Sequence, residues 1–431
     1  MRIDLDTAFL DDGIRSTNFF NGRLLSAEDL TQEQRARKEA LKQFGAALGE
    51  GVVHGLEVEA IVGGSSATEP VVTVKQGLAI NREGRALELK QPVEVSLLRG
   101  ASNDTSGAGG SADFGACAPP GSVYVSGTGV YLLVISEATG REGRAETSGL
   151  GGVTGSGCEA KRLVEGVRFR LLRLAVPDTD LENTTGKRQR LRNRVAHHCF
   201  GTTDTQAVPF RDYPFAVPAA GYGLIDKLRP QFLTDCDVPL AVIHWRDGEG
   251  IRFVDVWSAR RRPTRSAQPV RWALGVGDRR AAEGDAMFLQ FQEQLDALRA
   301  VNPQALKARE HFQYLPPTGV VPLGSASFPG FKQATFFEGV TVREVVTHVE
   351  GARVQALLRL GFAFPPVTFL PTTPSSTDPF VWVFKVRENQ QALSAFGPTQ
   401  EYLVFASGHM PDVSEPRFDT SHWSFGNYAL R

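Results

Sequence analysis

The first strong pattern along the chain is helical and lies between Ser26 and Gly49. Its large apolar residues fall on one face of the expected helix, and they are Leu30, Leu41, Phe44 and Leu48. Ser26 is a suitable N-cap, and Gly49 is a typical end signal. Most other positions carry charged or amide side chains, so the apolar stripe is narrow. Such a stripe suits a helix that lies against one partner surface, and that surface can belong to another chain.

After this helix the apolar residues recur at every second position, which is the period of a β-strand. Three valine-rich segments with this period predict strands over residues 51–62, 71–80 and 86–98. The sequence NREGR at residues 81–85 predicts a hairpin turn, because Gly84 can adopt the positive φ that tight turns require. The N-terminal region is therefore expected to combine one helix with a small β-module.

A second β-rich region follows the first. Residues 129–138 are almost all apolar and predict a strand buried on both faces, whereas residues 165–176 alternate. The glycine-rich stretch between these two segments predicts a long loop. Residues 237–261 predict a hairpin around the sequence RDGEG. A further amphipathic helix is predicted over residues 283–300, with an apolar face of Met287, Phe288, Phe291, Leu295 and Leu298.

The C-terminal region mixes both periods. Residues 349–360 predict a helix that ends before Pro365, and residues 380–389 and 401–408 predict strands. The sequence LPPTGVVPLG at residues 315–324 predicts a packed, rigid linker rather than a polyproline ligand.

The expected fold class is α+β and β-rich, in a chain long enough for two or three compact units. The predicted parts are an N-terminal helix with a β docking module (residues 1–100), a flexible glycine- and serine-rich loop (101–121), a central β-sandwich or barrel-like domain (122–265), a helical connector (266–310) and a smaller α+β C-terminal domain (311–431).

Charge argues against nucleic acid as a partner. The 47 basic and 48 acidic residues give a net charge of -1, so no overall field attracts a polyanion. The one dense basic run, residues 258–265, has no interleaved aromatics and predicts a solvated strand end or linker. The acidic N-terminus lacks a signal-peptide pattern, and no segment approaches the roughly 20 apolar residues of a spanning helix. We therefore expect cytoplasmic synthesis without a signal peptide.

Candidate chemistry is sparse. The sequence has no phosphate-binding loop, dinucleotide fingerprint, HExxH or GxSxG motif, and we expect no catalytic residue. The four cysteines are widely spaced without a CxxC motif, so a disulfide framework is not expected. Sulfur and imidazole ligands suit zinc, and the candidates are Cys158, His197, Cys199 and Cys236. Their spacing fits no zinc finger, and adjacent histidines on a strand cannot face one metal. No cofactor is therefore predicted, and these residues are expected to be separate buried thiols or exposed histidines. A structural zinc is the alternative.

Two other functions stay open at this point. Exposed aromatics in the C-terminal region would suit a carbohydrate- or cell-surface-binding module, and the candidates are Trp382, Trp423 and Tyr428. A cell-wall hydrolase would need a clustered pair of buried carboxylates with shifted pKa values, and the sequence indicates no such pair.

Several blocks of the sequence resemble one family. Residues 18–34 (NFFNGRLLSAEDLTQEQ), 51–59 (GVVHGLEVE) and 72–89 (VTVKQGLAINREGRALEL) resemble the start of structural proteins encoded in contractile injection system and prophage tail clusters. Residues 236–263 and 314–324 are similar to later blocks of the same family. The resemblance touches most of the chain in patches, and its motif recurs in phage tail-fibre and baseplate proteins.

The resemblance implies a non-enzymatic structural component of a contractile tail or tail-like particle. Its partners would be other tail or baseplate subunits, in a multi-copy or homo-oligomeric assembly. The chain lacks a repetitive shaft and a sustained heptad pattern, which favours a baseplate, collar or cap adaptor, or a fibre-attachment protein, over a fibre.

The expected interface lies at the N-terminal end of the chain. The residues predicted to form it are Phe19, Phe20, Arg23, Leu24, Leu30, Leu41 and Phe44. Residues 18–23 are expected to turn the chain back, so that Phe19 and Phe20 act as anchors for a neighbouring subunit. The alternative is that both phenylalanines belong to the core of this chain.

Overall fold

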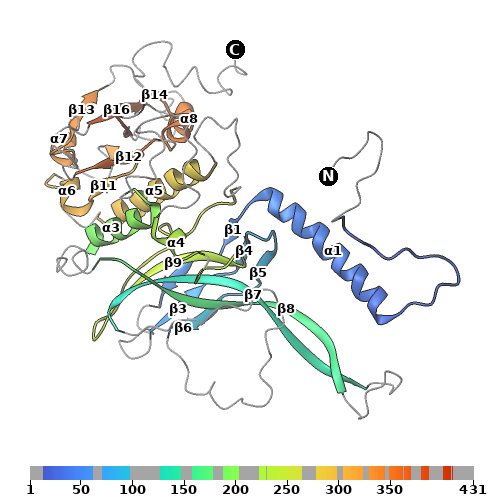
Figure 1. The fold of residues 1–431 in the computed structure, drawn as a ribbon. Helices are drawn as coiled ribbons and strands as arrows, with labels where there is room; N and C mark the ends of the chain where they lie inside the picture. The colour runs from blue at the N-terminus through green and yellow to red at the C-terminus, as the bar shows by residue number, and fades with distance from the viewer. Residues whose placement is uncertain are drawn as a thin grey trace, which may run out of the picture.

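The computed structural model describes residues 13–61, 70–97, 127–146, 158–177, 188–202, 223–229, 231–264, 278–298, 304–323, 330–344, 349–362, 364–369, 380–387, 401–408 and 410. The predicted loop at residues 101–121 lies outside these ranges. The chain is α+β and β-rich, as predicted, with several open sheets (Figure 1). No sheet closes into a barrel among the strands that the structure describes.

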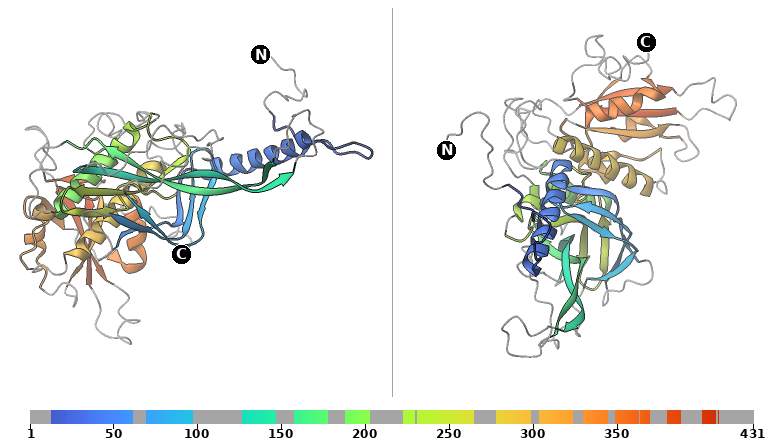
Figure 2. Two further views of the ribbon diagram at one scale, coloured as in Figure 1. Left: turned by 90° about the horizontal axis from the view of Figure 1, so that it is seen from below. Right: turned by 90° about the vertical axis from the view of Figure 1, so that its right-hand side faces the viewer.

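The first helix, α1 (Ala27–Leu48), matches the predicted one. Ser26 and Asp29 form a capping box, in which the Asp29 N–H donates to Ser26 Oγ at 3.2 Å and the Ser26 N–H donates to the Asp29 carboxylate at 3.1 Å. Gly49 caps the other end at a φ of 96°. The helix extends away from the small strands that follow it in the chain, with its N-terminal end farthest from them (Figure 2).

Two small sheets follow α1. Strands β1 (Gly51–Gly55), β4 (Gly77–Ile80) and β5 (Ala86–Leu89) form one, and β2 (Val58–Ala60), β3 (Val71–Val74) and β6 (Val93–Ser96) form the other. Gly84 has a φ of 82° in the turn between β4 and β5, which confirms the predicted hairpin.

The central sheet has the order β10-β9-β7-β8. Its strands are β7 (Gly129–Glu146), β8 (Cys158–Leu174), β9 (Asp237–Arg246) and β10 (Gly250–Asp255), and the hairpin of β9 and β10 is confirmed. The predicted loop was wrong for residues 139–146, which continue β7 and pair with β8. Charged residues and glycines there give no apolar alternation, because this outer ribbon buries neither face.

Both faces of the central sheet are covered where β7 and β9 pair. On one face Tyr131 and Ile243 join a core with Val52 and Leu87 of the N-terminal sheets. Residues predicted in two separate parts of the chain therefore share one hydrophobic core. On the other face Val130, Leu132 and Val242 pack against α3 (Arg188–Phe200) and α4 (Gly223–Lys227). Residues 130–135 are buried, as predicted, because both faces of the sheet are covered there.

Helix α3 also joins the central sheet to the C-terminal unit. The side-chain oxygen of Asn193 accepts hydrogen bonds from the backbone N–H groups of Gln313 and Tyr314, both at 2.9 Å. Its side-chain nitrogen donates to the Tyr314 carbonyl at 3.1 Å. Because Asn193 is buried, these three bonds satisfy a polar group that would otherwise be costly inside the protein.

The C-terminal unit is built on one five-stranded sheet and a two-stranded one. The larger has the order β12-β17-β16-β13, with β14 also paired to β16. Its elements are β12 (Thr318–Leu323), β13 (Thr341–Glu344), β14 (Val349–Glu350), β16 (Phe380–Arg387) and β17 (Glu401–Ser407); β11 (Tyr314–Leu315) and β15 (Val367–Thr368) form the smaller sheet. Helices α5 (Asp278–Ala297), α6 (Ala308–His311), α7 (Gln333–Phe336) and α8 (Gly351–Gly361) accompany them.

The predicted rigid linker at residues 315–324 was wrong. Most of it is β12, which pairs antiparallel with β17 and buries Val321 completely. The prolines of this segment argued against a strand, since proline is unfavourable inside a sheet. Strand β12 lies at the edge of its sheet, where a missing N–H is tolerated. None of the helices that the structure describes combines the length and apolar composition needed to cross a membrane.

Candidate interaction surface

The large apolar residues of α1 point into solvent. Leu30 is 52% exposed, Leu41 61%, Phe44 75% and Leu48 64%. We call these four residues the apolar face of α1. The helix instead turns small residues toward the rest of the chain, because Ala36 and Gly45 are its buried positions. This arrangement is the reverse of an ordinary surface helix, which buries its large apolar side chains.

Helix α1 meets the first β-module backbone to backbone. A Cβ atom built on Gly45 would lie 1.9 Å from the carbonyl oxygen of Gly84 in the turn between β4 and β5. Glycine is therefore required at residue 45 for the helix to sit this close. The contact fixes α1 to the molecule without using any residue of its apolar face.

The segment that precedes α1 folds back along the helix. The Thr17 N–H donates to the Glu33 carboxylate at 3.1 Å, and the Gln32 side chain donates to the Arg15 carbonyl at 2.7 Å. The turn has Gly22 at a φ of 90°, and the Arg23 N–H donates to the Phe20 carbonyl at 3.2 Å. The chain therefore turns back at residues 18–23, as predicted.

The two adjacent phenylalanines lie outside the core. Phe19 is 54% and Phe20 62% exposed, and Leu24 is exposed more fully still. Arg23 has a role within this chain, since it pairs with Asp29 and its guanidinium lies 5.9 Å from the Phe20 ring centroid. Thus Phe19, Phe20 and Leu24 are available to a partner, while Arg23 braces the turn that presents them.

The hairpin of β7 and β8 projects beside α1 (Figure 2). Lys38 of α1 forms an ion pair with Glu165 of β8. Leu163 and Val164, next to this glutamate, are exposed. The sequence did not indicate these two residues, because the strand pattern there is interrupted by charges and glycines. They add apolar surface beside the helix.

Single exposed leucines are common on protein surfaces and need no explanation. Here, however, four large residues share one helix face, and Phe19, Phe20 and Leu24 lie at its N-terminal end. Full burial of each such side chain stabilises a contact by about 1.5–3 kcal/mol. Large apolar residues gathered on one exposed helix face and at its N-terminal end are typical of a site that another macromolecule covers.

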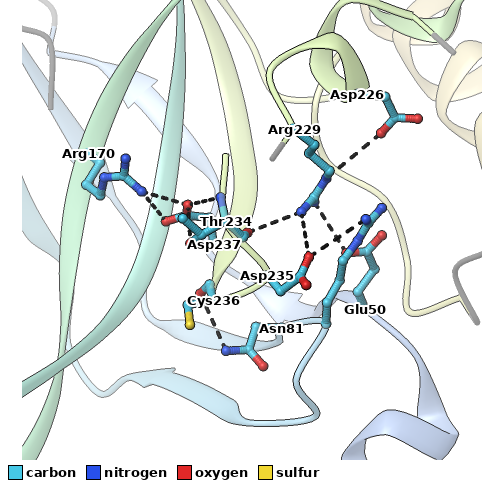
Figure 3. Close-up of polar contacts among 10 residues, drawn as sticks. Glu50, Asn81, Arg170, Asp226, Arg229, Thr234, Asp235, Cys236 and Asp237 are labelled. Carbon is cyan, nitrogen blue, oxygen red and sulfur yellow. Dashed lines mark hydrogen bonds and ion pairs between the residues drawn. The ribbon is translucent and has the colours of Figure 1, made fainter. Parts of the chain in front are cut away.

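A polar network holds the C-terminal end of α1 (Figure 3). Glu50, two residues after the helix, accepts a hydrogen bond from Arg82 Nε at 2.5 Å and is 3.4 Å from Arg229. Arg229 also pairs with Asp235 at 3.5 Å. The backbone of Glu50 exchanges two hydrogen bonds with that of Thr264, both at 3.0 Å. Residues distant in sequence thus fix the direction in which α1 leaves the molecule.

This network borders a cavity of about 80 Å³, whose wall includes Glu50, Arg82, Arg229, Arg279 and Glu283. The charges are paired, since Arg279 contacts Glu283 at 3.0 Å and Asp226 at 2.7 Å. Such pairing suits a structural joint between α1, α4 and α5. This joint could not be predicted from the sequence, because no local pattern links these residues.

Three of the four candidate zinc ligands have other roles. Residues 188–200 form a helix rather than a strand, and His197 stacks on Tyr314 with ring centroids 4.4 Å apart. Its Nδ1 is 3.1 Å from Thr202 Oγ1. Cys199 is a buried free thiol, and burial raises its pKa to about 12. Cys236 is disulfide-bonded, contrary to the expectation of separate thiols. The side chain of Cys158 lies outside the described residues, and within that part no three potential ligands converge.

Trp382 is a core residue, so its prediction as an exposed sugar platform was wrong. Only 7% of it is exposed, and its indole N–H donates to the Met410 carbonyl at 3.1 Å. The Arg343 guanidinium lies 5.8 Å from the ring centroid. Trp423 and Tyr428 lie outside the described residues. The described part of the C-terminal unit therefore uses this tryptophan for packing.

Two buried carboxylates are held by arginines. Asp255 lies 3.1 Å from Arg192 Nε. Burial alone would raise the pKa of Asp255, but the Arg192 charge and hydrogen bonds from Arg192, Gln290 and Ser258 lower it below its usual value. Asp237 is paired with Arg170 at 2.6 Å. Each of these buried acids is bound to a cation, which is the arrangement of a structural ion pair rather than of a carboxylate dyad.

Two buried histidines predict a loss of stability in acid. Burial, helped by Arg252 and Arg246, lowers the pKa of His244 to about 4, and burial with His198 and Arg280 holds that of His197 well below its usual value. The unfolded chain therefore takes up protons first as the pH falls below about 6.5. For His244 this costs about 2–3 kcal/mol by pH 4.

Urea titrations between pH 7 and pH 4.5 measure this effect. Substituting His244→Gln should flatten the dependence of the unfolding free energy on pH below 6.5. The matched substitution His54→Gln, on an exposed histidine of β1, controls for the removal of a histidine that is not buried. An equal dependence in all three proteins would show that His244 is not the residue responsible.

Neither the models of known protein families nor the sequences of curated proteins give a match to this chain.

Proposed function

We propose that this protein is a structural subunit of a contractile phage tail or a tail-like injection system, at a baseplate, collar or fibre-attachment position. It acts through contacts between subunits and not through catalysis. The observation that carries the proposal is the exposed apolar face of α1. This face is a feature of a protein that completes its packing only in an assembly.

Two features of the molecule support this function. The segment most similar to tail proteins, residues 18–34, is also the segment that presents Phe19, Phe20 and Leu24 to solvent. Helix α1 is fixed at its C-terminal end by Glu50 and by the close contact of Gly45, so its direction is set before a partner binds. A preordered surface of this kind reduces the entropy lost on association.

The proposal is tested with the full chain in cells that produce the particle. The chain is tagged at one end and the particles are separated on a density gradient. We expect the tagged chain to sediment with the sheath and tube proteins at a fixed ratio and to stay there through a second gradient. Recovery of the chain only at the top of the gradient, while intact particles lack it, would overturn the proposed function.

A further inference from the structure

The spacing of exposed residues on α1 is that of a two-helix seam. Leu30, Gln34, Arg37, Leu41, Phe44 and Leu48 are all exposed and follow one another at intervals of four, three, four, three and four residues. Residues spaced alternately by three and four face one partner helix along a shared axis. The apolar face of α1 is therefore shaped for a helix and not for a flat sheet.

The charges of α1 indicate which helix fits. Residues 27–34 contain Glu28, Asp29 and Glu33 and no basic residue, whereas residues 35–48 contain Arg35, Arg37, Lys38 and Lys42 with Glu39. The helix is thus acidic in its first part and basic in its second. Asp29, Lys38 and Lys42 already form ion pairs within the chain. Glu28, Arg35 and Arg37 form none with the residues that the structure describes, so they are the charges that a partner helix would meet. A second copy of α1 in antiparallel orientation sets each acidic half beside a basic half. A parallel copy would set like charges together.

The seam itself supports the same orientation. When two antiparallel copies are aligned so that Leu30 faces Leu41, Ala27 faces Phe44 and Gln34 faces Arg37. Small and large residues are then opposite each other, and the two polar residues meet in the middle. In a parallel pair Arg37 would face Arg37, which is unfavourable. Polar residues at the centre of a seam commonly fix its register.

We infer that the occupant of the apolar face of α1 is a second copy of this chain, whose α1 lies antiparallel to the first. Each copy brings the exposed Leu24 at the start of its helix near Leu48 of the other copy. The pair is a two-fold symmetric contact, in which the same surface is used on both sides. The inference rests on the proposed function, because it names the partner of a surface that the proposed function already assigns to assembly.

Charge substitutions at Gln34 test both the partner and the orientation. Because Gln34 faces Arg37 in the antiparallel pair, Gln34→Glu should tighten the dimer dissociation constant of the full chain on the order of fivefold. Gln34→Lys should weaken it by a similar factor. Analytical ultracentrifugation over a concentration series measures both. In matched controls Gln43→Glu and Gln43→Lys, on an exposed residue of α1 away from the seam, the constant should not change.

Every other outcome of these dissociation measurements overturns the inference. If Gln34→Glu and Gln34→Lys both weaken the dimer, the two helices are parallel, since residue 34 then faces itself. If the chain is monomeric up to about 100 µM, well above ordinary dimer constants, a second copy is not the occupant. A monomeric chain that still enters tail particles would leave the proposed function intact. An antiparallel dimer that never enters particles would overturn the proposed function alone.

Discussion

Substituting Asp237→Ala is expected to reduce the free energy of unfolding by about 3–5 kcal/mol. One guanidinium nitrogen of Arg170 donates to both carboxylate oxygens of Asp237, at 2.8 and 2.6 Å. The two side chains are 2% and 0% exposed, respectively. Alanine would leave the guanidinium buried without its counter-charge. The N–H and hydroxyl of Thr234, which donate to the same carboxylate at 2.7 and 2.8 Å, would also lose their acceptor.

The neighbouring Asp235 provides the control. Its side chain is 67% exposed, and its closest ion-pair distance is 3.5 Å, to Arg229. Asp235→Ala should therefore change the unfolding free energy by no more than about 1 kcal/mol. Urea denaturation followed by circular dichroism measures both variants. Equal losses would contradict the importance assigned to the buried pair.

The double substitution Leu41→Asp with Phe44→Asp is expected to lower incorporation into tail particles more than tenfold while leaving the isolated chain folded. Both residues are mostly exposed in the chain, so the unfolding free energy should change by no more than about 1 kcal/mol. At an interface, by contrast, each large anchor that is lost costs about 2 kcal/mol or more. The recovery of the chain in particles, measured on gradients, separates these two effects.

A second double variant controls for added negative charge. Gln43→Asp with Ala46→Asp places two aspartates on exposed positions of the same helix, outside its apolar face. Incorporation of this variant should stay within about twofold of the unmodified chain, because exposed positions outside an interface contribute little to binding. Equal loss in both double variants would mean that charge on α1, and not its apolar face, controls assembly.

Local signals explain which elements could be predicted from the sequence. The start of α1 at Ser26 and its end at Gly49 were predicted because capping chemistry depends on neighbouring residues alone. The turn at Gly84 was predicted for the same reason. Strand β12 was missed because its edge position, which makes proline acceptable, is a property of the whole sheet.

The exposed apolar stripe of α1 was easier to predict than the contacts that hold the helix in place. Phe44 and its neighbours on α1 were expected to face a partner, since a narrow apolar stripe on a charged helix suits contact with one partner surface. The joint of Glu50, Arg82 and Arg229 was not expected, because it depends on chain segments that meet only in the folded molecule. Helix α3 was missed as well, since its buried residues include Arg192, Asn193 and His197, which single-sequence patterns assign to the surface.

The most direct test of the central claim is the solvent accessibility of α1 before and after assembly. Hydroxyl-radical footprinting of the isolated chain at low concentration should modify Leu41, Phe44 and Leu48 readily. In assembled particles the same residues should be protected, while the exposed Phe232 outside α1 provides the reference for unchanged reactivity. Equal modification of Phe44 in the isolated chain and in particles that contain it would contradict the claim that the apolar face of α1 is an interface between subunits.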